Sequence, residues 1–195
     1  MFSATEHVMR TADYLDGHLL IAMPGMGDPR FDHSVIYMCA HSPEGAMGLV
    51  VNKLADQMTF PDLLEQLNIP CGASDDSIQV HFGGPVEESR GFVLHSNDYS
   101  QDGSMPVDEN MALTASVDVL SAMSKGEGPK MSLLALGYAG WGPGQLDAEI
   151  QANAWLHIAS NDELVFGRDQ EGKWSQAVTM LGIDLSLFST TAGHA

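Results

Sequence analysis

The sequence predicts an α+β fold, with about four helices packed on a mixed or antiparallel, barrel-like sheet. We expect one domain over residues 1–195. About seven short apolar runs are bounded by Gly, Pro or Asn, which is typical of strands. About four segments carry apolar residues at helical spacing. Successive strands are joined as hairpins more often than through a helix, and this connectivity favours antiparallel pairing.

The N-terminal third predicts three strands of one sheet. Residues 18–23 are an apolar run ended by Pro24, as in a strand that is buried on both faces. Residues 34–41 contain no Asp, Glu, Lys or Arg. The segment 42–45 places proline and glycine at the second and fourth positions of a type I turn. We therefore expect 34–41 and 46–52 to pair as an antiparallel hairpin.

The middle of the chain predicts two helices. Apolar residues within 60–67 share one helical face, with Thr59 as the N-cap and Pro70 as the stop. A second helix is expected over 116–125, where Ser116 is the cap. Two further strands are expected at 78–82, half-buried by its alternation, and at 91–95.

The C-terminal part predicts a buried strand at 131–137, a glycine-rich turn over 137–145, and a helix that carries Leu146 and Ile150 on one face. After that helix we expect a hairpin and a last amphipathic helix. The predicted segments are strands 155–159 and 164–166 around Asn161-Asp162, and helix 174–181 ended by Gly182.

Composition excludes several classes of protein. With 26 acidic and 8 basic residues the formal charge is −18, so a polyanion such as DNA would be repelled and direct DNA binding is not expected. The 44% of hydrophobic residues suffices for a core, yet no apolar run approaches the length of a membrane helix. Cys39 and Cys71 form no disulfide framework, and the first 16 residues lack the pattern of a signal peptide. We expect a cytoplasmic protein.

The glycine-rich segment 137–145 leaves two interpretations open. A glycine loop between a strand and a helix can bind an anion through exposed amides, and Gly140 and Gly142 would then be ligand-binding residues. However, the segment holds no Lys and matches neither phosphate-binding pattern, so a purely structural turn is the alternative.

Histidine and cysteine offer further candidates. The chain has 8 histidines, and His41 and His95 fall near the ends of predicted strands. No spacing typical of a metal site accompanies them, so hydrogen-bonded structural histidines are the simpler interpretation, and we expect no metal and no cofactor. Cys39 is two residues from His41 on the same strand face, so an activated thiol is an alternative to a buried, inert one.

Taken together, the motifs resemble the YqgE/AlgH family of bacterial proteins, and the resemblance runs along almost the whole chain in order. The residues that carry it are 17–24, Phe31, 34–37, His41, 45–48, Asn52, 83–86, 91–95, 137–141, 144–146, Trp155 and 192–195. The resemblance implies a compact α+β fold with a barrel-like mixed sheet. The resemblance implies no catalytic residues.

Two functional hypotheses follow. The resemblance implies an indirect transcriptional regulator or adaptor that acts through a protein or small-molecule partner. The alternative is an enzyme or ligand sensor whose polar cleft is lined by His41, Asn52, His95 and Gln145. We expect these four residues to meet because predicted strands lead into or out of the loops that carry them.

Overall fold

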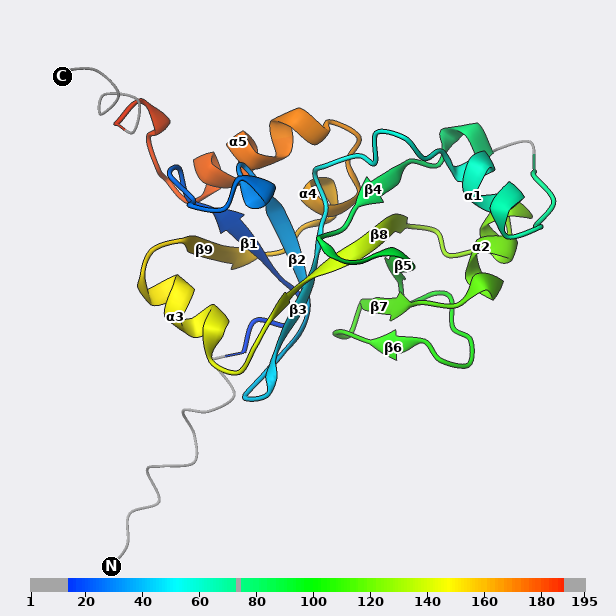
Figure 1. Cartoon of the computed structure of the whole chain (residues 1–195), viewed down its shortest axis with the longest axis horizontal. Helices are drawn as coiled ribbons and strands as arrows, with labels where there is room; N and C mark the ends of the chain where they lie inside the picture. The colour runs from blue at the N-terminus through cyan, green and yellow to red at the C-terminus, as the bar shows by residue number, and fades with distance from the viewer. Residues whose placement is uncertain (1–13, 73–74, 188–195) are drawn as a thin grey trace, which may run out of the picture.

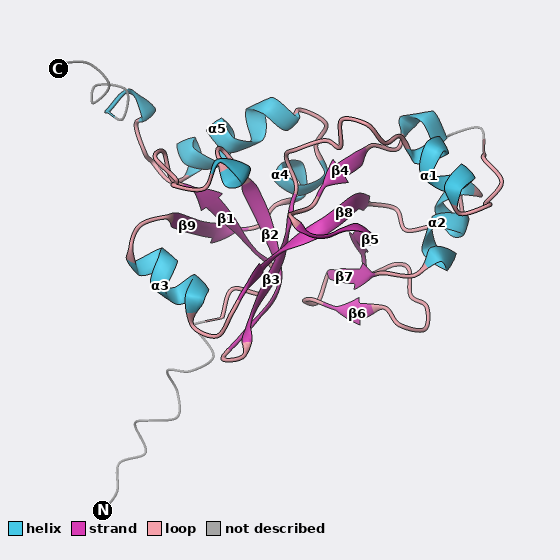
Figure 2. Ribbon diagram, in the orientation of Figure 1, coloured by secondary structure: helices cyan, strands magenta, loops and turns pink. Residues whose placement is uncertain are grey.

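The computed structural model describes residues 14–72 and 75–187. Nine strands of this part of the chain form one curled, largely antiparallel sheet, a half-barrel with five helices around it (Figures 1 and 2). The strands are β1 (His18–Ala22), β2 (Val35–Ser42), β3 (Gly45–Val50), β4 (Val80–Phe82), β5 (Val86–Ser96), β6 (Met105–Pro106), β7 (Met111–Thr114), β8 (Ser132–Trp141) and β9 (Trp155–Ala159). The helices are α1 (Phe60–Gln66), α2 (Val117–Ser124), α3 (Gln145–Gln151), α4 (Asp162–Phe166) and α5 (Gln170–Met180). The predicted α+β class is confirmed.

The strand order is β6-β7-β5-β8-β3-β2-β1-β9, and β4 pairs with β8 in parallel. As predicted, β2 and β3 form an antiparallel hairpin, with Ser42 opposite Gly45 at its tip. β1 lies between β2 and β9. The strand β8 connects the two halves of the sheet, because it pairs with β5 on one side and with β4 and then β3 on the other.

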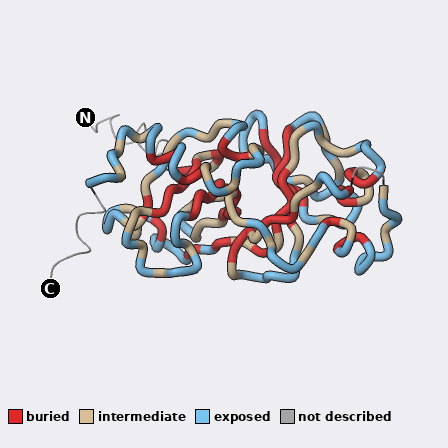
Figure 3. Tube along the Cα trace, turned by 90° about the horizontal axis from the view of Figure 1, so that it is seen from above, coloured by how far each residue is buried: buried red, intermediate tan, exposed pale blue. Residues whose placement is uncertain are grey.

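Helices cover both faces of the β1–β3 region. Trp174 and Val178 of α5 pack with Leu19 and Tyr37 on one face, while Leu146 of α3 belongs to the apolar cluster on the other. A third apolar cluster joins α1 and α2 to β4, β5 and β8. Figure 3 shows the buried stretches mainly in the middle of the molecule and the exposed segments mainly at its periphery. The first strand is therefore buried on both faces, as its continuous apolar pattern indicates.

Polar anchors fix α5 to the sheet. The ammonium of Lys173 is buried and donates to the carbonyl oxygens of Val51 at 2.8 Å and Val165 at 3.0 Å. The indole of Trp174 donates to the carbonyl of Ala22 at 2.8 Å. Burial lowers the pKa of Lys173 to about 8, because the charged ammonium loses its hydration. The two carbonyls replace part of that hydration.

Gly137 reverses the side-chain alternation of β8. Leu133 and Ala135 face the half-barrel interior, and after Gly137 the interior position passes to Tyr138 while Ala139 faces the α3 side. Gly137 has φ of +72°, and a Cβ there would lie 2.3 Å from the carbonyl oxygen of Gly84. Only glycine satisfies both conditions without strain. This irregularity turns Tyr138 toward the interior.

Several boundaries differ from the sequence-based predictions. Residues 164–166 belong to helix α4, not to a hairpin strand, because Asn161 caps that helix by accepting from the amide of Leu164. Residues 137–141 continue β8, so the predicted turn shortens to 142–144. Helix α1 ends at Gln66, ahead of Asn68 in the left-handed conformation, and not at Pro70.

Other differences concern length and caps. β5 is longer than the predicted strand, and β6 and β7 were not predicted at all. The strand β4 starts at Val80, and Val80 and His81 are both buried, so the expected half-buried alternation over 78–82 is wrong. Thr59 caps α1 as predicted, whereas the Ser116 side chain makes no capping hydrogen bond. None of the helices in the described ranges is long and apolar enough to cross a membrane.

Candidate functional site

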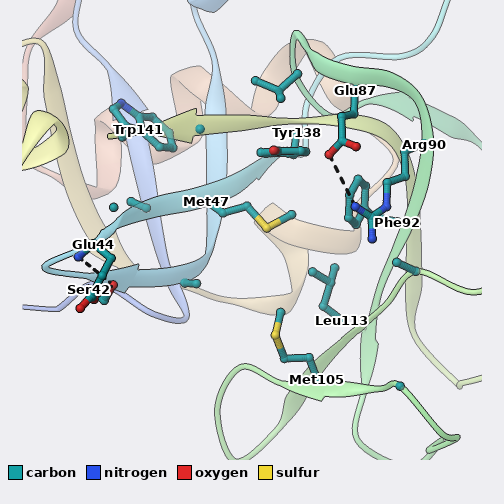
Figure 4. Close-up of a pocket in the computed structure, with 17 residues that line it drawn as sticks. Ser42, Glu44, Met47, Glu87, Arg90, Phe92, Met105, Leu113, Tyr138 and Trp141 are labelled. Carbon is teal, nitrogen blue, oxygen red and sulfur yellow. Dashed lines mark hydrogen bonds and ion pairs between the residues drawn. The ribbon is translucent and has the colours of Figure 1, made fainter. Parts of the chain in front are cut away.

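A groove of about 710 Å³ lies between the β2–β3 hairpin and the strands β5, β6 and β7, with the end of β8 between them (Figure 4). Its volume falls within the roughly 300–1,000 Å³ of ligand pockets. We define the groove by six of its lining residues, which come from segments far apart in the sequence: Glu44, Met47, Arg90, Phe92, Met105 and Tyr138.

The inner wall of the groove is apolar. Met47, Phe92, Leu113 and Tyr138 converge on the same space, as Figure 4 shows. The rings of Phe92 and Tyr138 meet edge to face with centroids 5.7 Å apart, a geometry that fixes both side chains. Met105 is 45% exposed at the mouth, where apolar surface meets solvent. The wall therefore offers apolar contacts to a ligand.

The rim of the groove is charged. The guanidinium of Arg90 lies 3.5 Å from the carboxylate of Glu87 and 5.1 Å from the centroid of the Phe92 ring. On the opposite side, the Ser42 hydroxyl donates to the carboxylate of Glu44 at 2.8 Å. The groove thus combines an apolar wall with two carboxylates and one guanidinium, which itself contacts one of those carboxylates.

Local backbone irregularities shape this rim. Between Val86 and Gly91 the register advances five residues on β5 against two on β8, from Tyr138 to Leu136. This bulge places Glu87 in the left-handed region, with φ of +49°, which is uncommon for a residue with a Cβ. Bulges next to binding sites re-aim side chains, and here the bulge carries Glu87 and Arg90.

The hairpin packs onto β8 through a glycine. Gly45 has φ of +146°, and a Cβ at this position would lie 2.5 Å from the carbonyl oxygen of Trp141. Met47 pairs with Gly140 in the adjoining β3–β8 ladder. Gly140 lines the groove and leaves its floor without a side chain. Of the six candidates predicted from the sequence, Gly140 is the one placed in the groove.

His41 is held by the segment that precedes β1. Its Nδ1 accepts from the amide of Leu15 at 3.3 Å, so Nε2 carries the proton and faces a carboxylate oxygen of Asp147 at 3.6 Å. The ring of Tyr14 contacts the imidazole edge to face at 5.4 Å. These contacts connect β2, through His41, to the segment before β1 and to the start of α3.

His95 is fully buried in the sheet. Its two ring nitrogens lie 2.9 Å from the carbonyl oxygen of Ser96 and 2.8 Å from the hydroxyl of Thr114. Both nitrogens are therefore satisfied within the protein. A buried, hydrogen-bonded histidine of this kind ties β5 to β7.

The side chains of Asn52 and Gln145 form hydrogen bonds with the backbone. The Asn52 amide accepts from the amide of Val35 at 2.9 Å and donates to the carbonyl of His33 at 2.8 Å. Gln145 accepts from the amide of Gly142 at 3.0 Å. The Gly142 amide, a candidate anion donor, is thus bonded within the loop, which supports the structural interpretation of residues 142–144.

The structure does not bring His41, Asn52, His95 and Gln145 into one cleft. His95 pairs with Ser132 at the start of β8, whereas His41 pairs with Ala46, which pairs with Trp141 at its end. A ten-residue strand spans about 30 Å, so the two histidines lie at opposite ends of β8. Asn52 contributes to a different pocket, beside Trp174.

Glu149 is a polar residue that the sequence reasoning missed. Its carboxylate accepts from the indoles of Trp141 and Trp155, both at 2.9 Å, and from the Gln145 amide at 3.0 Å. The two tryptophan rings meet edge to face at 5.9 Å. Glu149 therefore fastens α3 to β8 and β9. The sequence signal that could have indicated this role is the four-residue spacing between Gln145 and Glu149, which places both side chains on one helix face.

Nucleophilic chemistry at Cys39 finds no support. The thiol is buried, and burial raises its pKa to about 12, so it is a neutral thiol at physiological pH. Among the described residues, the groove lining contains no His, Cys or Lys. Within residues 14–72 and 75–187, no three His, Cys, Asp or Glu side chains are grouped to hold a metal ion. The geometry of the groove is suited to binding.

Comparison with known proteins identifies the family. A family model described as AlgH-like matches residues 19–186. The chain belongs to the AlgH-like family. It is 54% identical over 190 residues to a UPF0301 protein of Afipia carboxidovorans, covering 93% of this chain and 90% of that relative. A UPF0301 protein of Rhodospirillum rubrum is 53% identical over 182 residues, with 93% and 95% covered.

Two solved structures are similar to this chain in fold. The solution structure of the AlgH protein from Pseudomonas aeruginosa matches with a TM-score of 0.77 and 41% identity, covering 100% of both chains. The crystal structure of DIP2367 from Corynebacterium diphtheriae matches with a TM-score of 0.71 over 90% of this chain and 92% of that one. At 20% identity the second match supports the fold alone.

Proposed function

We propose that this AlgH-like protein is a non-enzymatic regulator or adaptor that acts through a partner bound in the groove. The observation that carries this proposal is the apolar wall of Met47, Phe92 and Tyr138 behind an open mouth. Apolar surface left open to solvent is a common mark of a binding site. The Ser42 hydroxyl and the Glu44 carboxylate form an exposed pair, and the described lining residues include no histidine to act as a general base, which favours binding over catalysis.

Regulation in this proposal is indirect. The charge of −18 opposes contact with the phosphates of DNA, so an effect on transcription would pass through the bound partner. We place this activity in the cytoplasm, since Cys39 and Cys71 are both free thiols, as is usual in a reducing compartment.

The proposal can be tested in a bacterium whose own copy of the gene has been deleted. Met105→Asp puts a charge at the mouth of the groove, and Met180→Asp makes the same change on α5, where Met180 is 58% exposed. We expect the native protein and Met180→Asp to restore the transcript profile, and Met105→Asp to fail while melting at the native temperature. Full restoration by Met105→Asp would refute a function for the groove.

A further inference from the structure

We propose that the groove binds a basic amphipathic peptide segment of a partner protein. The segment would bury its apolar side chains against Met47 and Met105 and place Lys or Arg side chains at Glu44 and Glu87. This inference rests on the function proposed above and names the chemistry of the partner. It is carried by two separate properties of the groove, its methionine-containing apolar wall and the sign of the charge at its rim.

The apolar wall is adaptable. Met47 and Met105 face each other across the groove from the β2–β3 hairpin and from β6 (Figure 4). Methionine side chains are unbranched and polarizable, so a wall that contains them accommodates apolar side chains of varied shape. Val86 and Met105 are large apolar residues of the lining that are exposed to solvent. A peptide would cover this surface with its apolar face.

The rim selects a cation. Glu44 and Glu87 lie on opposite sides of the groove. Of the described residues that line the groove, Arg90 alone is cationic, and its guanidinium is already placed between the Glu87 carboxylate and the Phe92 ring. An anionic ligand would have to displace Glu87 from Arg90 and would also face Glu44. A ligand with positive charges gains attraction from both carboxylates.

The surroundings reinforce this choice. Glu88 and Asp102 are exposed and adjoin the lining residues Glu87 and Gly103 in sequence, so further acidic residues flank the lining segments along the chain. The whole chain carries −18, which steers positively charged partners toward it and repels nucleic acid and anionic membranes. Among macromolecules with an apolar face, a basic protein segment is the one that both the wall and the rim favour.

The test uses fluorescence anisotropy with the full chain and a labelled amphipathic peptide made of leucine and lysine at helical spacing. The control peptide has glutamate in place of every lysine. Two double variants, each lacking two acidic charges, separate local from overall electrostatics. Glu44→Gln with Glu87→Gln changes the rim, and Glu65→Gln with Glu127→Gln removes the same charge from exposed positions outside the groove lining.

We expect saturable binding of the lysine peptide, no binding of the glutamate peptide, and weakening with salt because exposed charges are screened. The rim variant should bind about fivefold more weakly and the control variant less than about twofold, as is usual for exposed ion pairs. Met105→Gln should also weaken binding, whereas Met180→Gln should not.

Equal binding of the two peptides, no binding of either, or equal effects of the two double variants would overturn the inference. Its failure is distinguishable from failure of the proposed function. If Met105→Asp abolishes the response in cells but the lysine peptide does not bind the pure protein, the groove is functional and its partner is not a basic peptide. If Met105→Asp restores the response, the proposed function fails.

Discussion

His81 predicts a measurable loss of stability in acid. The ring is buried on β4, and Nδ1 lies 3.3 Å from the carbonyl oxygen of Leu134, so the neutral ring carries its proton on Nδ1. Burial and, second, the positive charge of Lys173 lower the pKa of His81 to about 4, from the usual 6.5. The folded protein therefore resists a protonation that the unfolded chain accepts.

The sign and size follow from this difference. Because the folded pKa lies below the unfolded one, the stability due to neutral His81 is fully present above about pH 6.5 and is lost as the pH falls toward about 4. Between about pH 8 and about pH 5 the loss from this residue alone is about 2 kcal/mol. Such a loss is a large share of the roughly 5–15 kcal/mol that stabilises a typical domain.

Urea unfolding at both pH values isolates the contribution. His81→Asn retains a donor for the Leu134 carbonyl but removes the titrating ring, and His157→Asn removes an exposed histidine from β9. We expect the loss between the two pH values to be about 2 kcal/mol smaller in His81→Asn than in the native protein. His157→Asn should differ from the native protein much less. An unchanged pH dependence in His81→Asn would refute the reasoning.

Three further predictions concern the scaffold. Gly137→Ala should destabilise the folded protein by at least about 2 kcal/mol, because a Cβ would lie 2.3 Å from the Gly84 carbonyl oxygen. The control Gly27→Ala, with open space around it, should cost under about 0.5 kcal/mol, and denaturant midpoints of the two variants measure the difference. Glu149→Gln should cost about 2 kcal/mol. Both indoles donate to one carboxylate oxygen, which the amide oxygen replaces without the negative charge, while the new NH2 group opposes the Gln145 amide donor. Exposed Glu109→Gln is the control, and equal denaturant midpoints would show that the three hydrogen bonds to Glu149 stabilise little. A thiol reagent added to the native protein should modify the exposed Cys71 and spare the buried Cys39, whose pKa is raised to about 12. Mass spectrometry after labelling identifies the modified residue, and modification of Cys39 would contradict the prediction.

Sequence patterns predicted the helices that bury one face and the strands that are buried on both faces. The hairpin of β2 and β3 followed from two charge-free or apolar runs around a proline–glycine turn, and α1, α2, α3 and α5 followed from helical spacing. These patterns reflect which face of an element contacts the core, and that information is local.

The predictions failed where local sequence is compatible with two structures. Residues 164–166 are a short apolar run that suits a strand or a helix, and the decisive feature is Asn161, which fits both a turn and an N-cap. Gly137 was expected at the boundary between strand and loop and Gly140 within the loop, although both lie inside β8. The backbone of Gly137 crosses Gly84 closely. That crossing is a tertiary contact, which the sequence alone does not reveal.

The candidate site shows the same limit. The sequence favours polar motif residues as site residues, whereas in the structure these residues hold elements of the fold together: His41, His95, Asn52 and Gln145. The groove is instead built from apolar residues such as Met47, Phe92 and Met105, which nothing in the sequence marks as site residues. Their convergence depends on the curl of the sheet, which brings β6 and the β2–β3 hairpin to opposite sides of one cavity.

Nuclear magnetic resonance of methyl-labelled methionine tests most directly whether the groove is the binding site. On titration with the leucine–lysine peptide we predict that the methyl signals of Met47 and Met105 shift together and saturate. The signal of Met180, exposed on α5, should stay in place. Shifts at Met180 or other methionines with no change at Met47 and Met105 would place binding elsewhere and contradict the account.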